Sequence, residues 1–314
     1  MNDKALKLVA LLAVIAAAVA AGLAGSAAGK AEGGAAATAA SASGQKTLTV
    51  DDIINRSNYV AYYQGKDGRA KIKMTVVDKQ GQKRQKELII LRRDQPAPGA
   101  KDAGKAADAA KAKAAADAAD MAYCREQKFY VYFQSPPDDN KTTFLVWKKL
   151  DADDDRWLYL PNLDLVKRIA ATDKRTSFVG SHFYYEDVSG RNLSADKHEL
   201  LKTTDQYYVL RNTPKDPKTV EFAYYDMYVL KDSFVPVYVW YYDKGGKKYR
   251  TYSVLKWDRD KTFGYAVVRA ARMADANIGG HTDLQYDDVR FNMALPESLF
   301  TERYLKRTPY RFLK

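Results

Sequence analysis

The stretch Ala70-Lys-Ile-Lys-Met-Thr-Val76 decides the fold class, because apolar and polar residues alternate along it at every step. Successive side chains of a β-strand point to opposite faces, so this pattern predicts a strand with one buried and one exposed face. Gly81 follows it and predicts a turn into a second strand over residues 83–93. The chain is therefore expected to build a sheet from this point onward.

Similar strand patterns continue almost to the end of the chain. Most of them are joined by short connections that contain Gly, Asp, Asn or Pro, and Lys244-Gly245-Gly246 is typical of a hairpin turn. No helical pattern of useful length interrupts the series, which argues against parallel βαβ units. The further strands are expected at 128–134, 142–148, 156–161, 165–169, 197–203, 207–212, 220–230, 235–243, 247–257, 264–274 and 281–291.

About a dozen consecutive antiparallel strands must curl, because large sheets twist and do not stay flat. The predicted fold is therefore mainly β, an incomplete (unclosed) antiparallel β-barrel with a helical lid. Thr49-Val-Asp-Asp52 resembles a capping box, and apolar residues from Val50 to Ala61 share one helical face, which predicts one helix before the strands. A second helix is expected at Glu297–Lys306, introduced by Pro296.

The N-terminal region has the pattern of a secretory signal peptide. Lys4 and Lys7 precede an apolar run over residues 8–23, and small residues follow. We expect a signal peptide at 1–28, a flexible leader at 29–46 and a single domain at 47–314. An uncleaved membrane anchor is the alternative interpretation of the apolar run. The expected location is the periplasm.

An insertion over residues 95–123 separates two strands that would otherwise form a hairpin. Between Gly99 and Asp120, 12 of 22 residues are Ala, and four Lys balance four Asp. Such a segment lacks an apolar stripe wide enough to pack firmly. It is interpreted as a loop elaboration, with a partner-docking arm as the alternative.

The composition argues against several classes of protein. The 314 residues carry a net charge of +12 and include 23 Tyr but one Cys, Cys124, which excludes an internal disulfide framework and a Cys-based zinc site. The net positive charge suits anionic partners. Arg250 with Tyr252 could belong to a groove that stacks nucleic-acid bases. Export to the periplasm argues against nucleic acid as a partner.

No combination of residues predicts catalysis, a metal or a cofactor. The three histidines are far apart in the sequence, and no phosphate-binding Gly-rich loop is present. Ser181 and His182 are adjacent, and adjacent residues rarely reach the geometry of a catalytic triad with a residue such as Asp187. The acidic residues of 151–155 lack the distal Glu of a calcium loop, so they are interpreted as a solvated turn. We expect a protein that is not an enzyme.

Apolar and aromatic residues are abundant on both faces of the predicted strands. Phe129, Val131 and Phe133 share one face, whereas Tyr130 and Tyr132 share the other, where their hydroxyls are expected to reach water. A sheet of more than about eight strands encloses more space than its side chains fill, so its concave side has room for an apolar ligand. The candidate lipid-binding residues are Ile72, Met74, Val76, Phe129, Val131, Phe133, Leu158, Leu160, Val237 and Val239.

Five motifs of the sequence form a recognisable set: Phe144–Trp147, Asp153–Pro161, Val166–Ile169, Ser177–Asp187 and Leu295–Tyr304. The most specific block among them is Trp157-Leu-Tyr-Leu-Pro161. Through these motifs the chain resembles, from about Val50 to Lys306, the outer-membrane lipoprotein-sorting protein family, the LolA-like periplasmic lipid and lipoprotein carriers. The Ala-rich insertion departs from the family pattern, and no local match assigns individual cavity residues.

The resemblance implies an incomplete barrel, lidded by helices, whose apolar cavity binds acyl chains of lipids or lipoproteins for transport toward the outer membrane. It further implies an inner-membrane RND-type exporter or an outer-membrane acceptor as partner. Two alternatives remain at this point: a structural or interaction β-domain, and an outer-membrane-associated barrel without carrier activity. The latter would show a lipid-facing apolar band, whereas Lys71, Lys73 and Thr75 occupy one strand face here.

Overall fold

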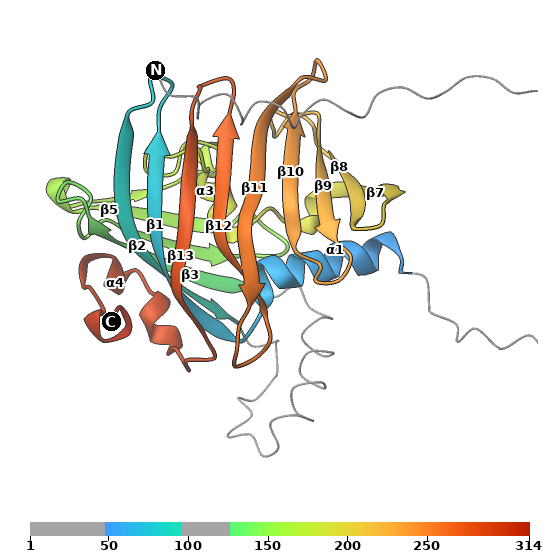
Figure 1. Cartoon of the computed structure of the whole chain (residues 1–314). Helices are drawn as coiled ribbons and strands as arrows, with labels where there is room; N and C mark the ends of the chain where they lie inside the picture. The colour runs from blue at the N-terminus through green and yellow to red at the C-terminus, as the bar shows by residue number, and fades with distance from the viewer. Residues whose placement is uncertain (1–47, 96–125) are drawn as a thin grey trace, which may run out of the picture. The chain divides into compact units, whose positions relative to one another are not determined.

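The computed structural model describes residues 48–95 and 126–314, which fall in the second of the two units of the chain, Thr47–Lys314 (Figure 1). The predicted signal peptide, the leader and all but the first residue of the predicted insertion lie outside the described residues. The unit is built on one antiparallel sheet of 13 strands. The mainly β fold expected from the sequence is confirmed.

The strands follow one another as neighbours in two runs that meet at β1 and β13. The order is β6-β5-β4-β3-β2-β1-β13-β12-β11-β10-β9-β8-β7, so β6 and β7 are the two ends of an open sheet. The strands are β1 (Asp67–Val77), β2 (Lys83–Asp94), β3 (Gln127–Ser135), β4 (Thr143–Lys148), β5 (Asp155–Leu160), β6 (Leu165–Arg168), β7 (Asp196–Thr203), β8 (Tyr207–Pro214), β9 (Tyr224–Leu230), β10 (Pro236–Tyr242), β11 (Lys248–Arg259), β12 (Ala266–Asp275) and β13 (His281–Phe291).

Every strand expected from the sequence is present. The largest difference is at β9, which begins at Tyr224 rather than Val220. Val220 and Phe222 lie before the strand and are buried in a small cluster with Tyr225 and Tyr249. These two buried apolar residues of the loop before β9 made the predicted strand too long at its start. The β2–β3 pairing continues to Asp94↔Gln127, so the insertion does connect the two strands of a hairpin.

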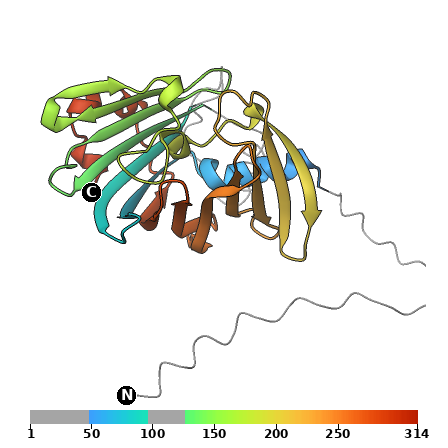
Figure 2. The same cartoon turned by 90° about the horizontal axis from the view of Figure 1, so that it is seen from above.

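The predicted N-terminal helix is α1 (Val50–Asn58), followed by a π-helical turn, η1 (Tyr59–Tyr63). Thr49 accepts a hydrogen bond from the Asp52 amide and the Asp52 side chain accepts one from the Thr49 amide, which confirms the capping box. Ile53 and Ile54 are buried against β8 and β9. Figure 2 shows α1 inside the curve of the sheet.

The continuous helix expected at 297–306 is wrong. The segment forms three short pieces, η5 (Glu297–Phe300), α4 (Arg303–Lys306) and η6 (Tyr310–Phe312), because Thr301 is extended and interrupts the helix. The break allows Phe300 and Leu305 both to be buried against the outer face of the sheet. This C-terminal segment lies beside β2–β5 in Figure 1.

The same segment overturns one expectation about the tyrosines. Tyr130 and Tyr132 do lie on the face opposite Phe129, Val131 and Phe133, but they are buried beneath the C-terminal segment. The Tyr130 hydroxyl donates to the Tyr304 carbonyl at 3.0 Å, instead of facing water.

A connector over residues 169–195 joins β6 to β7, the two ends of the sheet. It contains η3 (Ala171–Asp173), α3 (Tyr185–Ser189) and η4 (Leu193–Ala195), separated by irregular turns. No helix in residues 48–95 or 126–314 has the length and apolar character needed to cross a membrane.

Candidate functional site

The concave face of the sheet carries the largest group of predicted site residues. Most of them belong to one apolar cluster of side chains from β1–β5, β12 and β13, called here the concave cluster. Seven of the ten predicted residues are buried in it and an eighth, Leu160, packs against it. The seven are Ile72, Met74, Val76, Phe129, Val131, Phe133 and Leu158.

The other two predicted residues, both on β10, lie elsewhere. Val237 is buried with Val235 and Ala266. Val239 packs against the clusters around α1 and around Phe222. The sequence could not separate them from the first eight, because alternation fixes only which face a residue occupies and not its neighbours along a curved sheet.

The connector covers the concave cluster with three aromatic rings. The ring of Phe178 lies 5.9 Å from that of Phe133 and 5.3 Å from that of Phe144. Tyr185 packs against Phe144 at 5.2 Å, and Phe183 is buried in the same cluster. The cover is therefore made by a segment outside the sheet.

This cover corrects the expectation of an unfilled concave side. The seven buried site residues are at most 6 % exposed, because the connector occupies the space in front of them. The sequence did contain a signal: the aromatic run of Ser177–Asp187 lies in an irregular region with no strand pattern of its own. Large apolar rings in such a region indicate a segment that packs on something else.

Ion pairs, rather than sheet hydrogen bonds, tie the connector to the β7–β11 side. Arg250 of β11 is fully buried and donates through Nη2 to the Asp187 carboxylate and, at 3.1 Å, to the His182 carbonyl. Arg175 pairs with Glu186 inside the connector and with Glu221, at 2.6 Å, in the β8–β9 loop.

Arg250 and Glu221 stay ionised across the physiological range. Burial opposes the charged form of Arg250, but Asp187, Tyr241 and Tyr184 together raise the pKa of the guanidinium. Burial also works against the carboxylate of Glu221, yet hydrogen bonds from Arg175 hold its pKa below the ordinary value. The connector is thus held by charges whose removal would leave buried partners uncompensated.

A second set of polar contacts ties the connector to β4 and β5. Lys148 donates to the Ser189 carbonyl at 2.7 Å, and the Ser189 hydroxyl donates to Asp154 at 2.8 Å. Arg156 pairs with the same Asp154 at 2.6 Å. The connector is therefore anchored on both sides of the curved sheet.

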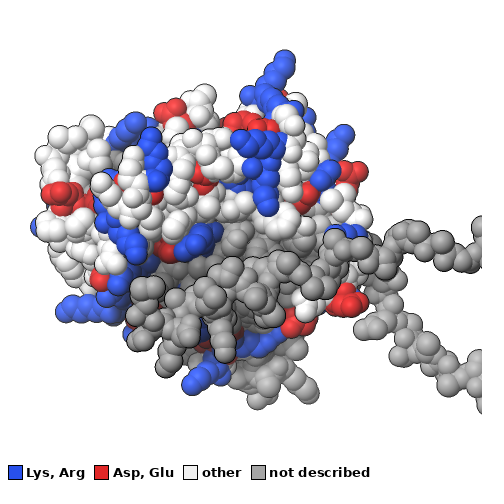
Figure 3. Space-filling model, turned by 45° about the horizontal axis from the view of Figure 1, so that its top comes forward, with Lys and Arg blue, Asp and Glu red and all other residues white. Residues whose placement is uncertain are grey.

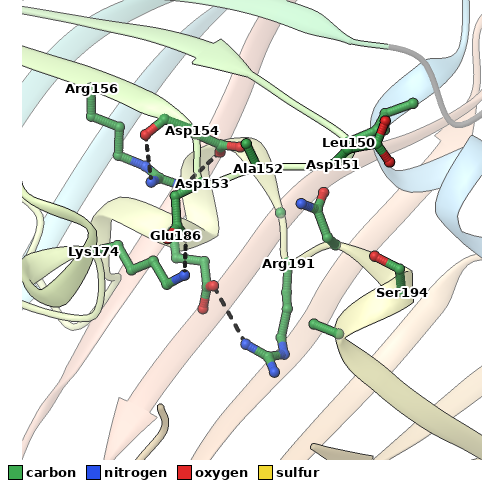
Figure 4. Close-up of a pocket in the computed structure, with 13 residues that line it drawn as sticks. Leu150, Asp151, Ala152, Asp153, Asp154, Arg156, Lys174, Glu186, Arg191 and Ser194 are labelled. Atoms are coloured by element: carbon green, nitrogen blue, oxygen red, sulfur yellow. Dashed lines mark hydrogen bonds and ion pairs between the residues drawn. The ribbon is translucent and has the colours of Figure 1, made fainter. Parts of the chain in front are cut away.

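A polar pocket of about 390 Å³ lies between the β4–β5 turn and the connector (Figure 4). Its ionic groups are largely paired with one another: Lys174 with Asp153, Arg156 with Asp154, and Arg191 with Glu186. The predicted solvated turn at 151–155 forms one wall of this pocket. The lining carries four carboxylates against three cations, so the pocket has a surplus of only one negative charge.

The residues considered for catalysis have structural partners. His182 contacts the Thr282 hydroxyl at 2.8 Å and the Gly279 carbonyl at 3.0 Å, whereas Asp187 pairs with Arg250. In residues 48–95 and 126–314, no group of three or more His, Cys, Asp or Glu side chains could hold a metal ion.

Arg250 does not belong to an exposed nucleic-acid groove, since it is fully buried. On the face shown in Figure 3, Lys and Arg side chains are spread over several regions with Asp and Glu between them. Many of the described cations are paired, for example Arg272 with Asp283 at 2.6 Å and Lys128 with Glu297 at 2.6 Å.

A protein-family model described as "uncharacterized protein" matches residues 125–307. No curated protein gives a significant match.

Among solved structures, a DUF1329 family protein from Desulfovibrio piger is 22 % identical, with 82 % of this chain and 97 % of that chain covered and a TM-score of 0.67. A putative outer membrane lipoprotein-sorting protein domain from Vibrio parahaemolyticus is 24 % identical, with 82 % and 98 % covered and a TM-score of 0.65. A LolA superfamily protein from Nitrosomonas europaea is 16 % identical, with 82 % and 100 % covered and a TM-score of 0.58. These likenesses are of fold.

Proposed function

Because this chain belongs to a LolA-like family, we propose that it is a periplasmic carrier without enzymatic activity. It binds acyl chains of lipids or lipoproteins on the concave side of its sheet and carries them toward the outer membrane. The N-terminal signal-peptide pattern supports the location. An inner-membrane RND-type exporter or an outer-membrane acceptor is the corresponding partner.

One observation carries the proposal: a continuous apolar surface on the sheet is covered by a segment that is not part of the sheet. The concave cluster contributes side chains from β1–β5, β12 and β13, and the connector closes it with Phe178, Phe183 and Tyr185. Displacing the connector would uncover that surface without breaking a strand pairing. In an ordinary core the apolar surface is covered by other strands of the fold, so uncovering it would require those strands to separate.

The energetics favour an acyl chain as occupant. Each CH₂ group transferred from water to an apolar surface contributes about 0.8 kcal/mol, so a long chain can replace the contacts of the three aromatic rings. An acyl chain is uncharged, so it can bind the uncovered surface without an ionic contact. The outer face of β2–β5 is occupied by the C-terminal segment. This arrangement supports a ligand on the concave side. It also argues against a lipid-facing apolar band on the outer face.

Organic extraction of the protein purified from its native compartment, followed by lipid mass spectrometry, tests the proposal. We expect stoichiometric lipid in the extract. Met74→Arg places a cation on the concave face of β1 and should abolish lipid retention, whereas Thr75→Arg, one residue along on the outer face, should retain it.

Circular dichroism shows whether both variants are folded. If Met74→Arg does not fold, Leu160→Arg serves instead, because Leu160 is only partly buried at the edge of the concave cluster. Lipid-free native protein, or a folded concave-face variant that still retains lipid, would contradict the carrier function.

A further inference from the structure

Four tyrosines and one arginine meet on the concave side, next to the concave cluster. They come from η1 (Tyr62), β10 (Tyr241), β11 (Arg250 and Tyr252) and β13 (Tyr286), and are called here the tyrosine–arginine cluster. Tyr252 and Tyr286 pack against the concave cluster, and the Arg250 guanidinium lies 5.2 Å from the ring centre of Tyr241. Residues far apart in the chain thus bring phenol groups to one region.

Tyr62 is placed there by close packing of its ring. A Cβ atom on Gly190 would lie 2.6 Å from Cζ of Tyr62, so only glycine allows the connector to approach this closely. The Lys148 ammonium lies 5.4 Å from the ring centre, and Arg92 donates to the Tyr62 carbonyl at 2.7 Å. The ring is therefore fixed, although its hydroxyl has no hydrogen-bond partner among the residues that the structure describes.

The cluster has more hydrogen-bond donors than the protein uses. Within residues 48–95 and 126–314, none of the four tyrosine hydroxyls has a hydrogen-bond partner, and all four residues are half-buried. Arg250 is fully buried, and its Nε and Nη1 likewise donate to no acceptor in the part of the chain that the structure describes. Among the described residues of the cluster, only Nε and Nη1 of Arg250 are fully buried donors without an acceptor, and the half-buried tyrosine hydroxyls lie in the same region. A buried donor without an acceptor is costly, so an arginine with two of them is unusual for a purely structural core.

The hydroxyls are close enough to influence one another and remain protonated. Burial raises the pKa of Tyr286 to about 12. Burial also raises the pKa of Tyr241 to about 12, against the opposing effect of Arg250. The pKa of Tyr62 is raised by burial and then by Asp187, Tyr241 and Tyr286. At neutral pH the cluster therefore offers phenol O–H and guanidinium N–H donors.

We propose that the tyrosine–arginine cluster binds the phosphate ester of a phospholipid headgroup, while the concave cluster holds the acyl chains. This inference rests on the proposed carrier function and names the class of lipid. A phosphate diester presents several oxygen acceptors on one centre and one negative charge, which matches phenol donors gathered in one region with a cation.

The ion pair between Arg250 and Asp187 explains how the covered state, with the connector in place, exchanges with the lipid-bound state. With the connector in place, the Asp187 carboxylate neutralises Arg250, and Tyr184 of the connector covers the guanidinium at 3.9 Å. Displacing the connector removes both contacts and leaves the Arg250 cation without its counter-charge. A phosphate that enters with the lipid replaces the carboxylate. Displacement of the connector therefore uncovers the concave cluster for the acyl chains and, at the same time, leaves Arg250 available to pair with an anion.

Binding measurements on delipidated full-length protein test this inference. The variant is the double substitution Tyr252→Phe and Tyr286→Phe, which removes two hydroxyls and keeps both rings. The matched control is Tyr228→Phe with Tyr238→Phe, a cross-strand pair on the outer face. The probes are a short-chain phosphatidylglycerol, the diacylglycerol with the same chains, and inorganic phosphate.

We expect the concave double variant to bind the phosphatidylglycerol at least tenfold more weakly and the diacylglycerol unchanged, since each lost hydrogen bond to a charged group is worth about a tenfold change. The outer-face control should bind both lipids like the wild type. Equal losses for both lipids, or no loss for either, would overturn the headgroup site and leave the carrier function standing.

The other outcomes are equally distinct. Inorganic phosphate that binds the wild type as tightly as the phosphatidylglycerol, with the same dependence on the two hydroxyls, would assign the cluster to a free anion and contradict a lipid headgroup. If neither lipid binds the wild type, the carrier function fails and this inference fails with it.

Discussion

Replacing Phe178 with Ala should open the connector without unfolding the sheet. Phe178 is 3 % exposed and contacts the rings of Phe133, Phe144 and Tyr185 at centre distances of 5.9, 5.3 and 5.5 Å. Deleting a buried phenyl ring costs about 3–5 kcal/mol. Because the ring belongs to the cover, we expect the loss to fall on the equilibrium between covered and uncovered states. About 3 kcal/mol corresponds to roughly a hundredfold more frequent opening.

Hydrogen exchange followed by mass spectrometry measures this effect segment by segment. Peptides of the connector should lose protection by about two orders of magnitude, whereas peptides of β3 and β4 should keep theirs. Phe300→Ala is the matched control, because Phe300 is also fully buried but covers the outer face. It should loosen the C-terminal segment and leave the connector protected. Equal loss of protection in the connector and the sheet after Phe178→Ala would refute the idea of a separable cover.

Three further predictions concern pH and backbone strain. Burial raises the pKa of Glu221, but the hydrogen bonds and positive charge of Arg175, together with the Tyr249 hydroxyl, bring it below 4.5. The ionised group therefore stabilises the fold above about pH 4.5. Chemical denaturation should show this stability falling as the pH drops further, and falling less in Glu221→Gln. Tyr241 and Tyr286 have pKa values of about 12, against 10.0 for free tyrosine, so both should stay protonated near pH 11. At that pH the phenolate absorbance should be lower for the folded than for the unfolded protein. The free energy of unfolding should fall between pH 10 and 12. Gly190→Ala should destabilise the protein by more than about 1 kcal/mol in denaturant titrations, because Gly190 has φ +75° and leaves no room for a Cβ. A variant as stable as the wild type would contradict the close packing of Gly190 against Tyr62.

The sequence by itself determined the strands and their faces. Alternation such as that of residues 70–76 has the period of a pleated strand, and it places Ile72, Met74 and Val76 on one side whatever the strand later packs against. The capping box at Thr49 is likewise local, because both of its hydrogen bonds join residues three apart. These features depend on neighbours in the chain and need no knowledge of the rest of the molecule.

Only the tertiary structure decided what covers each face. The period of a strand cannot show that the C-terminal segment buries Tyr130 or that the connector fills the concave side with Phe178, since both contacts join residues far apart in sequence. The helix expected at 297–306 is broken for the same reason, because burial of Phe300 and Leu305 against the sheet outweighs local helix propensity. The tyrosine–arginine cluster is the clearest case. Its members carry no distinguishing pattern in the sequence, and it is the curvature of the sheet that brings them to one region of the concave side.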